Sequence, residues 1–441
     1  MRIKLMAGAA LALVMTSPAF ANSSNVTQNN SAHSATVDQT GGVAGSSDID
    51  QSGTQNSATV TQSDSAASAA GPAANSNDID QTGSLNGANV TQINTGAGAA
   101  ATNSSAITQS ADSATATVYQ DGTGNTSDID QSAAGIATAD VQQSGGDNTA
   151  LVNQHGTGGS VTVDQGFTGG GSETSYADVD QIGTDGTVSV LQSGNVQSAT
   201  ISQDGTNNIA NVDQSGDNNV ANAIQSGADS LVQITQIGTA FGSSVYVEQT
   251  GDNSSFYGVQ NGSGNVIGSP VAFLQSADNS LTSIDQNGTD NQVDGSQAGN
   301  LNKILVEQDD TNQYVSAIQS GSSNSLDSTQ SGNLNSAYFD QSGTLNDVLI
   351  VQAGSSNLAN IVQSGNGNDL DIDQFGADNE VDINQIGDSG IIDVAQNTAG
   401  AYAEVNQSGG TGNEAYVTQG SLDSVSIITQ VGSNNFASIN Q

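Results

Sequence analysis

A glutamine recurs every eleven residues through most of this chain. The register begins at Gln28, ends at Gln441 and includes 36 glutamines. Between Gln275 and Gln396 the interval is eleven residues eleven times in succession. A fixed short period is typical of architectures in which similar units stack on one another. We therefore expect a stack of similar units, whose function lies in the stacked surface and its ends.

Each eleven-residue unit combines a strand pattern with a turn pattern. In the unit from Gln203 to Gln214, the residues Asn208, Ala210 and Val212 occupy alternate positions. Alternation indicates a strand with one buried face, and we expect the Asp, Asn, Thr and Ser between these positions to face solvent. The positions after the glutamine, often Ser-Gly, are typical of a turn, because glycine adopts positive φ without steric cost.

The buried amides decide between two arrangements of these strands. Tight hairpins would give an antiparallel meander. Its buried glutamines and asparagines would lack partners, and each unpaired buried amide costs about 1–3 kcal/mol. Parallel in-register stacking at about 4.8 Å instead pairs each amide with identical amides above and below.

We therefore predict an all-β fold. It is a β-solenoid of about 18 two-strand coils, each built from two eleven-residue half-repeats, with parallel in-register stacking. The side chains that we expect to form the internal ladder are Gln203, Asn208, Gln214, Gln308, Gln319, Gln330, Gln341, Asn346, Gln352, Gln363, Asn368 and Gln374.

The first 21 residues have the pattern of a secretory signal peptide. Arg2 and Lys4 precede an apolar run at Leu5–Met15, and the small-x-small cleavage pattern ends at Ala21. That run is too short to span a bilayer, and no later run approaches that length. We expect residues 1–21 to be removed and the rest to be secreted to the extracellular space or cell surface, without membrane insertion.

We expect residues 22–441 to form one repeat solenoid, irregular over 22–180 and most regular over 275–441. Four intervals are much longer than eleven residues, and we interpret their excess Ala, Gly and Ser as enlarged turns. These intervals are Gln62 to Gln81, Gln92 to Gln109, Gln165 to Gln181 and Gln260 to Gln275. A linker at Phe167–Ser175 is the alternative. No capping element precedes Gln441, which favours open-ended polymerisation.

Charge and composition exclude several classes of partner. All 44 acids lie in residues 22–441, and Lys303 is the only Lys or Arg in that range. This negative charge excludes nucleic acid and anionic membranes as partners. The chain has no cysteine and therefore no disulfide framework. Only 34% of residues are hydrophobic, which would suggest disorder if the period did not indicate regular structure.

The repeat resembles that of the curlin family, the subunits of bacterial curli fibres. Gln203, Gly205, Asn208, Ala210 and Gln214 match the family pattern Gln-x-Gly-x2-Asn-x-Ala-x3-Gln, and Gln341, Gly343, Asn346 and Gln352 match it with Val348 in place of the alanine. The resemblance implies a β-solenoid subunit that is exported across the outer membrane and polymerises into extracellular amyloid fibres for adhesion and biofilm matrix. It also implies curli-type export and nucleation proteins as partners.

Acidic and threonine pairs are the other candidate sites. Asp-x-Asp recurs before the repeat glutamine, and outward carboxylates could hold Ca²⁺ nonspecifically, with Asp371 and Asp373 as the weak metal candidate. The interpretation we prefer is a solvated acidic face. The same pattern occurs at Asp48 and Asp50, Asp78 and Asp80, Asp128 and Asp130, and Asp178 and Asp180. Thr-x-Thr occurs at Thr59 and Thr61 and at Thr115 and Thr117, a pattern that ice-binding solenoids use. The interpretation we prefer is that these threonines are ordinary outward strand formers.

We find no catalytic constellation and expect no enzyme activity and no cofactor. His33 and His155 lie far apart in the sequence, and we expect both to be exposed turn residues. We expect no carboxylate to be buried against apolar side chains that would raise its pKa, as a catalytic acid requires. Two alternatives to a fibre subunit stay open: a monomeric surface solenoid that acts as an adhesin or a cation- or ice-binding module, and an accessory or nucleator subunit of a curli system.

Overall fold

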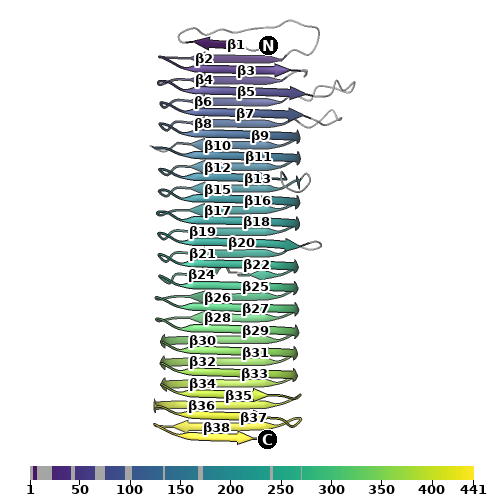
Figure 1. Cartoon of the computed structure of the whole chain (residues 1–441), viewed down its shortest axis with the longest axis vertical. Helices are drawn as coiled ribbons and strands as arrows, with labels where there is room; N and C mark the ends of the chain where they lie inside the picture. Colours follow the sequence, from purple (N-terminus) through teal and green to yellow (C-terminus); the bar gives the residue numbers. More distant parts are fainter. Residues whose placement is uncertain are drawn as a thin grey trace. The chain divides into compact units, whose positions relative to one another are not determined.

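The computed structural model describes residues 3–6, 22–40, 45–64, 75–94, 102–132, 135–166, 172–238, 242–269 and 271–441. The chain divides into two compact units, Met1–Ala221 and Asn222–Gln441. In the described residues every regular element is a strand, and in each unit the strands form two sheets, A and B, that alternate along the chain (Figure 1).

In the first unit each strand of sheet B is followed by one of sheet A. Sheet B contains β2 (Ser23–Gln28), β4 (Ser46–Gln51), β6 (Ser76–Gln81), β8 (Ser104–Gln109), β10 (Thr126–Gln131), β12 (Thr149–Gln154), β15 (Tyr176–Gln181) and β17 (Ser198–Gln203). Sheet A contains β1 (Ile3–Met6), β3 (Ser34–Thr40), β5 (Ser57–Asp64), β7 (Gly87–Asn94), β9 (Thr115–Thr123), β11 (Thr138–Gly146), β13 (Ser160–Gln165), β14 (Ser172–Glu173), β16 (Thr187–Asn195) and β18 (Ile209–Asp217).

The second unit repeats this order, and β19 (Val220–Gln225) contains the boundary between the units. Sheet B continues with β21 (Ser244–Gln249), β23 (Val266–Ile267), β24 (Phe273–Gln275), β26 (Gln292–Gln297), β28 (Tyr314–Gln319), β30 (Ser336–Thr344), β32 (Leu358–Asn366), β34 (Glu380–Asp388), β36 (Tyr402–Thr411) and β38 (Val425–Val431). Sheet A contains β20 (Leu231–Gly238), β22 (Ser255–Ser263), β25 (Leu281–Thr289), β27 (Lys303–Thr311), β29 (Ser325–Asn333), β31 (Asp347–Ser355), β33 (Asp369–Ala377), β35 (Ile391–Gln396), β37 (Glu414–Gln419) and β39 (Phe436–Asn440).

From β2 onward, successive strands of one sheet are parallel and in register, which confirms the predicted β-solenoid. The described strands make about 17 turns, close to the 18 expected. In β31 and β33, for example, Asp347 lies opposite Asp369 and Gln352 lies opposite Gln374. A slip of one residue would turn every buried side chain of a strand towards solvent, so the buried face fixes this register.

The core is a thin layer between the two sheets. In β31 the side chains of Val348, Ile350 and Gln352 are buried, and the residues between them face outward. The same alternation recurs in most strands, as period-two patterning predicts. The interior therefore consists of rows of aliphatic side chains beside rows of amides.

Two phenylalanines enlarge this core locally, and two glycines make room for them. The rings of Phe256 and Phe273 are buried, with centroids 5.9 Å apart. A Cβ at Gly258 would lie 3.1 Å from the Phe256 ring, and a Cβ at Gly295 would lie 2.9 Å from the Phe273 ring. Large and small residues thus complement each other within β22 and between the neighbouring strands β24 and β26, as close packing requires.

The turns use the left-handed conformation at two positions. Gly343 and Gly365 adopt it with φ of 103° and 111°, as expected of turn glycines. The residue two positions later, one before the buried asparagine, also has positive φ, and there it is often not glycine: Leu334, Leu345 and Ser356 have φ near 55–59°. The sequence analysis did not predict this second position.

The expectation of an enlarged turn is wrong for the interval from Gln260 to Gln275. The extra residues lie between Ile267 and Phe273, where they interrupt a strand: Val245 pairs with Ile267, and Val247 pairs with Phe273. In the other three long intervals, residues 65–74, 95–101 and 167–171 lie outside the described residues, so the expected enlarged turns fall there. Ser172 and Glu173, in the range where a linker was the alternative, instead pair with β11 as strand β14.

Two further observations concern the first residues and the stacking within 275–441. Most of the signal-peptide segment lies outside the described residues, except Ile3–Met6, which pairs antiparallel with β3. Within 275–441 the stacking has one irregularity, a register shift between β34 and β36 after Ile386. There β36 has one residue more than β34, within the twelve-residue interval from Gln407 to Gln419.

Candidate functional site

The repeat glutamines form two continuous ladders in each unit, one on the buried face of each sheet. In sheet A of the second unit, Gln308 Nε2 donates to Gln330 Oε1 at 2.9 Å, and Gln330 Nε2 donates to Gln352 Oε1 at 2.6 Å. In sheet B, Gln319 Nε2 donates to Gln341 Oε1 at 2.7 Å. The series continues from Gln341 to Gln363 and from Gln352 to Gln374.

Most of these glutamines also bond to the backbone of the opposite sheet. Gln330 Nε2 lies 3.2 Å from the carbonyl oxygen of Tyr314, and Gln341 Nε2 lies 3.1 Å from that of Ser325. Both amide hydrogens are therefore used, one between coils and one across the core. In the first unit, Gln203 and Gln214 accept from the glutamines of the preceding coil, Gln181 and Gln192, at 3.1 and 2.9 Å.

The asparagines stack differently from the expectation that each amide pairs with an identical amide. Asn346 Nδ2 donates to the carbonyl oxygens of Ser342 and Gly365, at 2.8 and 3.0 Å. Its Oδ1 accepts the backbone N–H of Asn368, 3.1 Å away in the next coil. The correction has a geometric reason: the short asparagine side chain sits in the turn, where backbone groups lie nearer than the next side-chain amide. Asn208 likewise donates to the carbonyl oxygen of Asp204 at 2.9 Å.

Side-chain length explains why asparagine and glutamine occupy different positions. Gln197 and Gln313 replace the turn asparagine, and Gln197 Nε2 still donates to the carbonyl oxygens of Ser193 and Gly216, at 2.6 and 2.8 Å. The buried Oε1 atoms of Gln197 and Gln313 have no hydrogen-bond partner, because the longer side chain carries the oxygen past the N–H that asparagine reaches. The turn position therefore favours asparagine.

This repeat matches a known family model. The model of the curlin associated repeat matches residues 183–216, 205–238, 321–354 and 346–376, which include most of the ladder residues discussed above. The chain is a curlin-repeat protein. Both this repeat family and the β-solenoid fold are structural rather than enzymatic. A comparison with curated protein sequences finds no match.

In the first coil of the curlin-repeat protein a histidine takes the asparagine position, so the expectation of an exposed His33 is wrong. His33 is buried. Its Nε2 lies 2.8 Å from the carbonyl oxygen of Asn29, and its Nδ1 accepts the backbone N–H of Asn56 at 3.3 Å. With Nδ1 as the acceptor, Nε2 is the ring atom that donates to the carbonyl oxygen of Asn29. His155 is exposed as expected, with Nε2 4.0 Å from a carboxylate oxygen of Asp130.

The paired aspartates of the curlin repeats lie on the outer faces, and one set stacks directly. Asp48 lies opposite Asp78, and Asp50 lies opposite Asp80. Burial, followed by the Asp48, Asp80 and Asp50 carboxylates, raises the pKa of Asp78. Such rows weaken the stack, because two unit charges about 4.8 Å apart repel by about 0.9 kcal/mol in water.

The candidate pair Asp371 and Asp373 lies on β33 beside Asp393 of β35. Burial, followed by the carboxylates of Asp373, Asp393 and Asp369, raises the pKa of Asp371. Among the described residues, no three His, Cys, Asp or Glu side chains come together in a way that could hold a metal ion.

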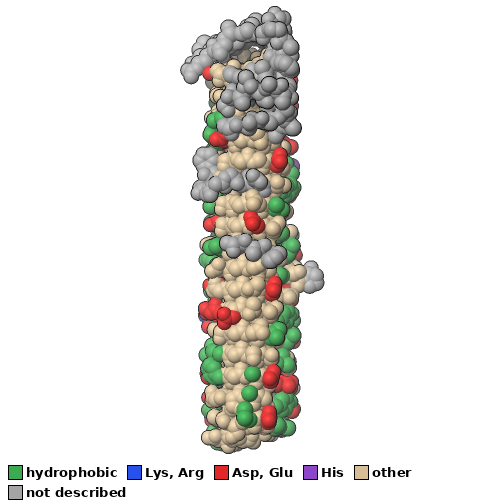
Figure 2. Space-filling model, turned by 90° about the vertical axis from the view of Figure 1, so that its right-hand side faces the viewer, with side chains coloured by type: hydrophobic (Ala, Val, Ile, Leu, Met, Phe, Trp, Pro, Cys, Tyr) green, Lys and Arg blue, Asp and Glu red, His purple; other side chains and the backbone are tan. Residues whose placement is uncertain are grey.

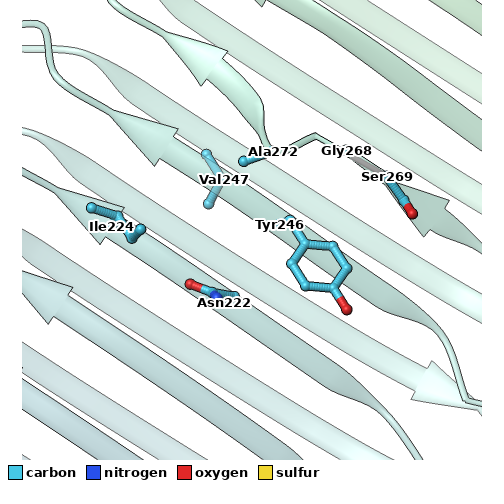
Figure 3. Close-up of a pocket in the computed structure, with 7 residues that line it drawn as sticks. All are labelled: Asn222, Ile224, Tyr246, Val247, Gly268, Ser269 and Ala272. Atoms are coloured by element: carbon cyan, nitrogen blue, oxygen red, sulfur yellow. The ribbon is translucent and has the colours of Figure 1, made fainter.

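Two of the shallow hollows in the described part of the curlin-repeat protein lie on its outer faces. One, of about 280 Å³, lies over Gly87 and is also lined by Thr59 of β5 and Thr117 of β9. Asn89 of β7 pairs with both of these threonines and so interrupts their row. The other, of about 290 Å³, lies on sheet B where the strand is interrupted before Phe273 (Figure 3). Its lining residues are Asn222, Ile224, Tyr246, Val247, Gly268, Ser269 and Ala272, none of which is charged.

None of the described segments is a helix with the length and hydrophobicity needed to cross a bilayer.

Proposed function

We propose that this protein is a secreted structural subunit that self-assembles end to end into extracellular, curli-like amyloid fibres for cell adhesion and biofilm matrix. The segment up to Ala21 directs export, and curli-type export and nucleation proteins serve as partners. The curlin associated repeats support this proposal. So does the outward acidity, which keeps the chain soluble before assembly.

The interchangeable coil surface is the observation that carries the proposal. Each coil offers the next a row of backbone N–H and C=O groups, two glutamine amides and, in most turns, an asparagine. Because Gln330 meets Gln352 in the same way as Gln308 meets Gln330, the surface of one coil fits that of almost any other. A coil of another chain can therefore take the place of the next coil of the same chain.

The test is fibre growth by purified residues 22–441, followed by thioflavin fluorescence and electron microscopy. We expect fibres from the wild type and slower growth when the ladder residues Gln319, Gln341 and Gln363 are replaced together by leucine. Gln233→Leu is the matched control, because Gln233 faces solvent on β20 and its loss removes no rung. Monodisperse single chains would contradict the proposal and favour a monomeric surface solenoid. Growth of the triple variant at the wild-type rate would remove the role of the ladders.

Export has a separate readout. Mass spectrometry of the protein collected from the outside of cells should give a chain that begins at Asn22. A chain that still carries residues 1–21, or that stays inside the cell, would contradict the proposed localisation.

A further inference from the structure

The two sheets of the second unit present different chemistry to solvent at the same level of the stack. The first, third and fifth residues of each strand face outward. On β28, β30 and β32 of sheet B, one of these nine side chains is a carboxylate, Asp340, and five are aliphatic or aromatic. On β29, β31 and β33 of sheet A, five of nine are carboxylates. Sheet B therefore has an apolar outer face here, and sheet A has an acidic one.

The apolar face is well exposed. Ile318, Tyr338 and Val362 are 45%, 43% and 45% exposed. The rings of Tyr314 and Tyr338 lie against each other, with centroids 5.4 Å apart. Figure 2 shows hydrophobic side chains gathered along the flanks of the second unit, in the lower half of the view.

Two strained leucines extend this face at the ends of β30. Leu334 precedes the strand and Leu345 follows it, with 53% and 67% of their surface exposed. Both have positive φ, at 59° and 55°, a conformation that costs a residue with a side chain about 1–2 kcal/mol. Ser323 and Asn312 occupy this position in neighbouring turns. Exposed leucines at a position that suits small polar residues point to a contact that uses them.

We propose that this lateral surface, formed by Ile318, Leu334, Tyr338, Leu345 and Val362, binds the same surface on a second copy of the chain in a neighbouring fibre. The inference rests on the proposed fibre assembly. Charge selects the occupant: two copies of so acidic a chain approach each other most easily where carboxylates are fewest. Once paired, the acidic faces of sheet A at this level point away from each other, so a third fibre is repelled from both sides.

Area limits where the pairing occurs. Three strands at about 4.8 Å spacing and six residues at about 3.3 Å give a face of roughly 300 Å². A stable interface needs roughly 800 Å² on each partner, so single chains stay monomeric. In a fibre the surface recurs once per chain on the same side, and each contact made raises the effective concentration for the next. Pairing is therefore a property of fibres.

The test compares fibre width with fibre growth. The triple substitution of Ile318, Tyr338 and Val362 by threonine keeps residues that favour strands and removes the apolar surface. Leu349→Thr is the control, because Leu349 is similarly exposed on the acidic face of sheet A. In electron micrographs we expect paired wild-type and control fibres and an at least tenfold smaller fraction of pairs for the triple variant. Elongation rates measured by thioflavin should agree within about twofold.

Three results would overturn the inference. Wild-type fibres that are single at all concentrations would refute pairing and leave the proposed function intact. Pairs that persist in the triple variant would place the contact elsewhere. Single wild-type fibres that bind hydrophobic beads through these residues would assign the surface to another partner. If no fibres form at all, the proposed function fails and the inference fails with it, an outcome distinct from single fibres.

Discussion

Replacement of one ladder glutamine should disturb two neighbours at once. In Gln330→Met the side chain keeps its approximate length and loses its amide, so no large cavity forms. Gln308 Nε2 then loses its 2.9 Å acceptor, although it retains the carbonyl oxygen of Gln292. Gln352 Oε1 loses its donor at 2.6 Å. Each orphaned buried group costs about 1–3 kcal/mol, so we expect a loss of about 2–6 kcal/mol in local stability.

In a triple variant, Gln308, Gln330 and Gln352 are all replaced by methionine. Its loss of local stability should be far less than three times that of Gln330→Met. Within the replaced block every rung is apolar and no amide lacks a partner. Orphaned groups remain only at the ends of the block, on Gln286 and Gln374. The number of orphans is the same as in the single variant, so the expected side-chain cost is again about 2–6 kcal/mol.

Hydrogen exchange of the backbone amides in β27, β29 and β31 measures these local costs, and each single variant serves as a control for the triple. Exchange suits a repeat protein, in which one global unfolding free energy is poorly defined. Additive costs, with the triple equal to the sum of the three singles, would refute the ladder argument. A single variant with unchanged protection would refute it too.

Three further predictions concern charge, packing and the turn amide. Burial and neighbouring carboxylates raise the pKa of Asp78 and Asp371 above the ordinary value of 3.8. The folded chain therefore binds more protons than the unfolded one between 3.8 and the raised pKa. The urea midpoint and the rate of fibre growth should both rise as the pH falls from 7 towards 4, and no change in either would contradict this. Gly295→Val should cost about 3 kcal/mol in local stability, measured by hydrogen exchange of the backbone amides in β24, β26 and β28, because a Cβ there would lie 2.2 Å from a carbonyl oxygen and 2.9 Å from Phe273; unchanged protection would contradict this. Gln313→Asn should add about 1 kcal/mol, because asparagine at this position accepts the N–H of the next coil; unchanged protection of that amide would refute the reason.

The sequence alone predicts the ladder, because in-register stacking places Nε2 of each glutamine next to Oε1 of the glutamine in the next coil. The interval between glutamines fixes which strands stack, and alternation fixes which side chains point inward. Gln308, Gln330 and Gln352 therefore lie together in one ladder, and Gln319 and Gln341 lie together in another. That two ladders exist follows from two half-repeats in each coil.

The bonding of the turn asparagines could not be predicted from the same argument. Whether Asn346 bonds to an amide or to the backbone depends on the φ of Leu345, which places the turn carbonyls near its Nδ2. Positive φ at a leucine is not evident from residue type. The burial of His33 could have been predicted from the sequence. His33 follows Gln28 by the same five residues that separate each turn asparagine from its glutamine.

The location of the insertion before Phe273 required packing information. Counting residues shows that the interval is too long, but not whether the excess lies in the turn or in the strand. Asn265 follows Gln260 at the usual spacing and bonds to the carbonyl oxygen of Gly288 at 3.2 Å, so the turn itself is unchanged. The excess therefore falls within the following strand. That asparagine was the usable signal, because it marks the end of each turn.

The ladder glutamines alone do not determine which coil stacks on which, because they are the same in every coil. A shift of one residue is prohibited, because it moves every glutamine to solvent. A shift of one whole coil is not, because glutamine again meets glutamine. Only the residues that differ between coils can oppose such a shift, and Phe273 is one of these, since it requires a glycine, Gly295, beside it in the next strand. The repeated residues thus make coils interchangeable between chains, and the large and small core residues keep the coils of one chain in their own order.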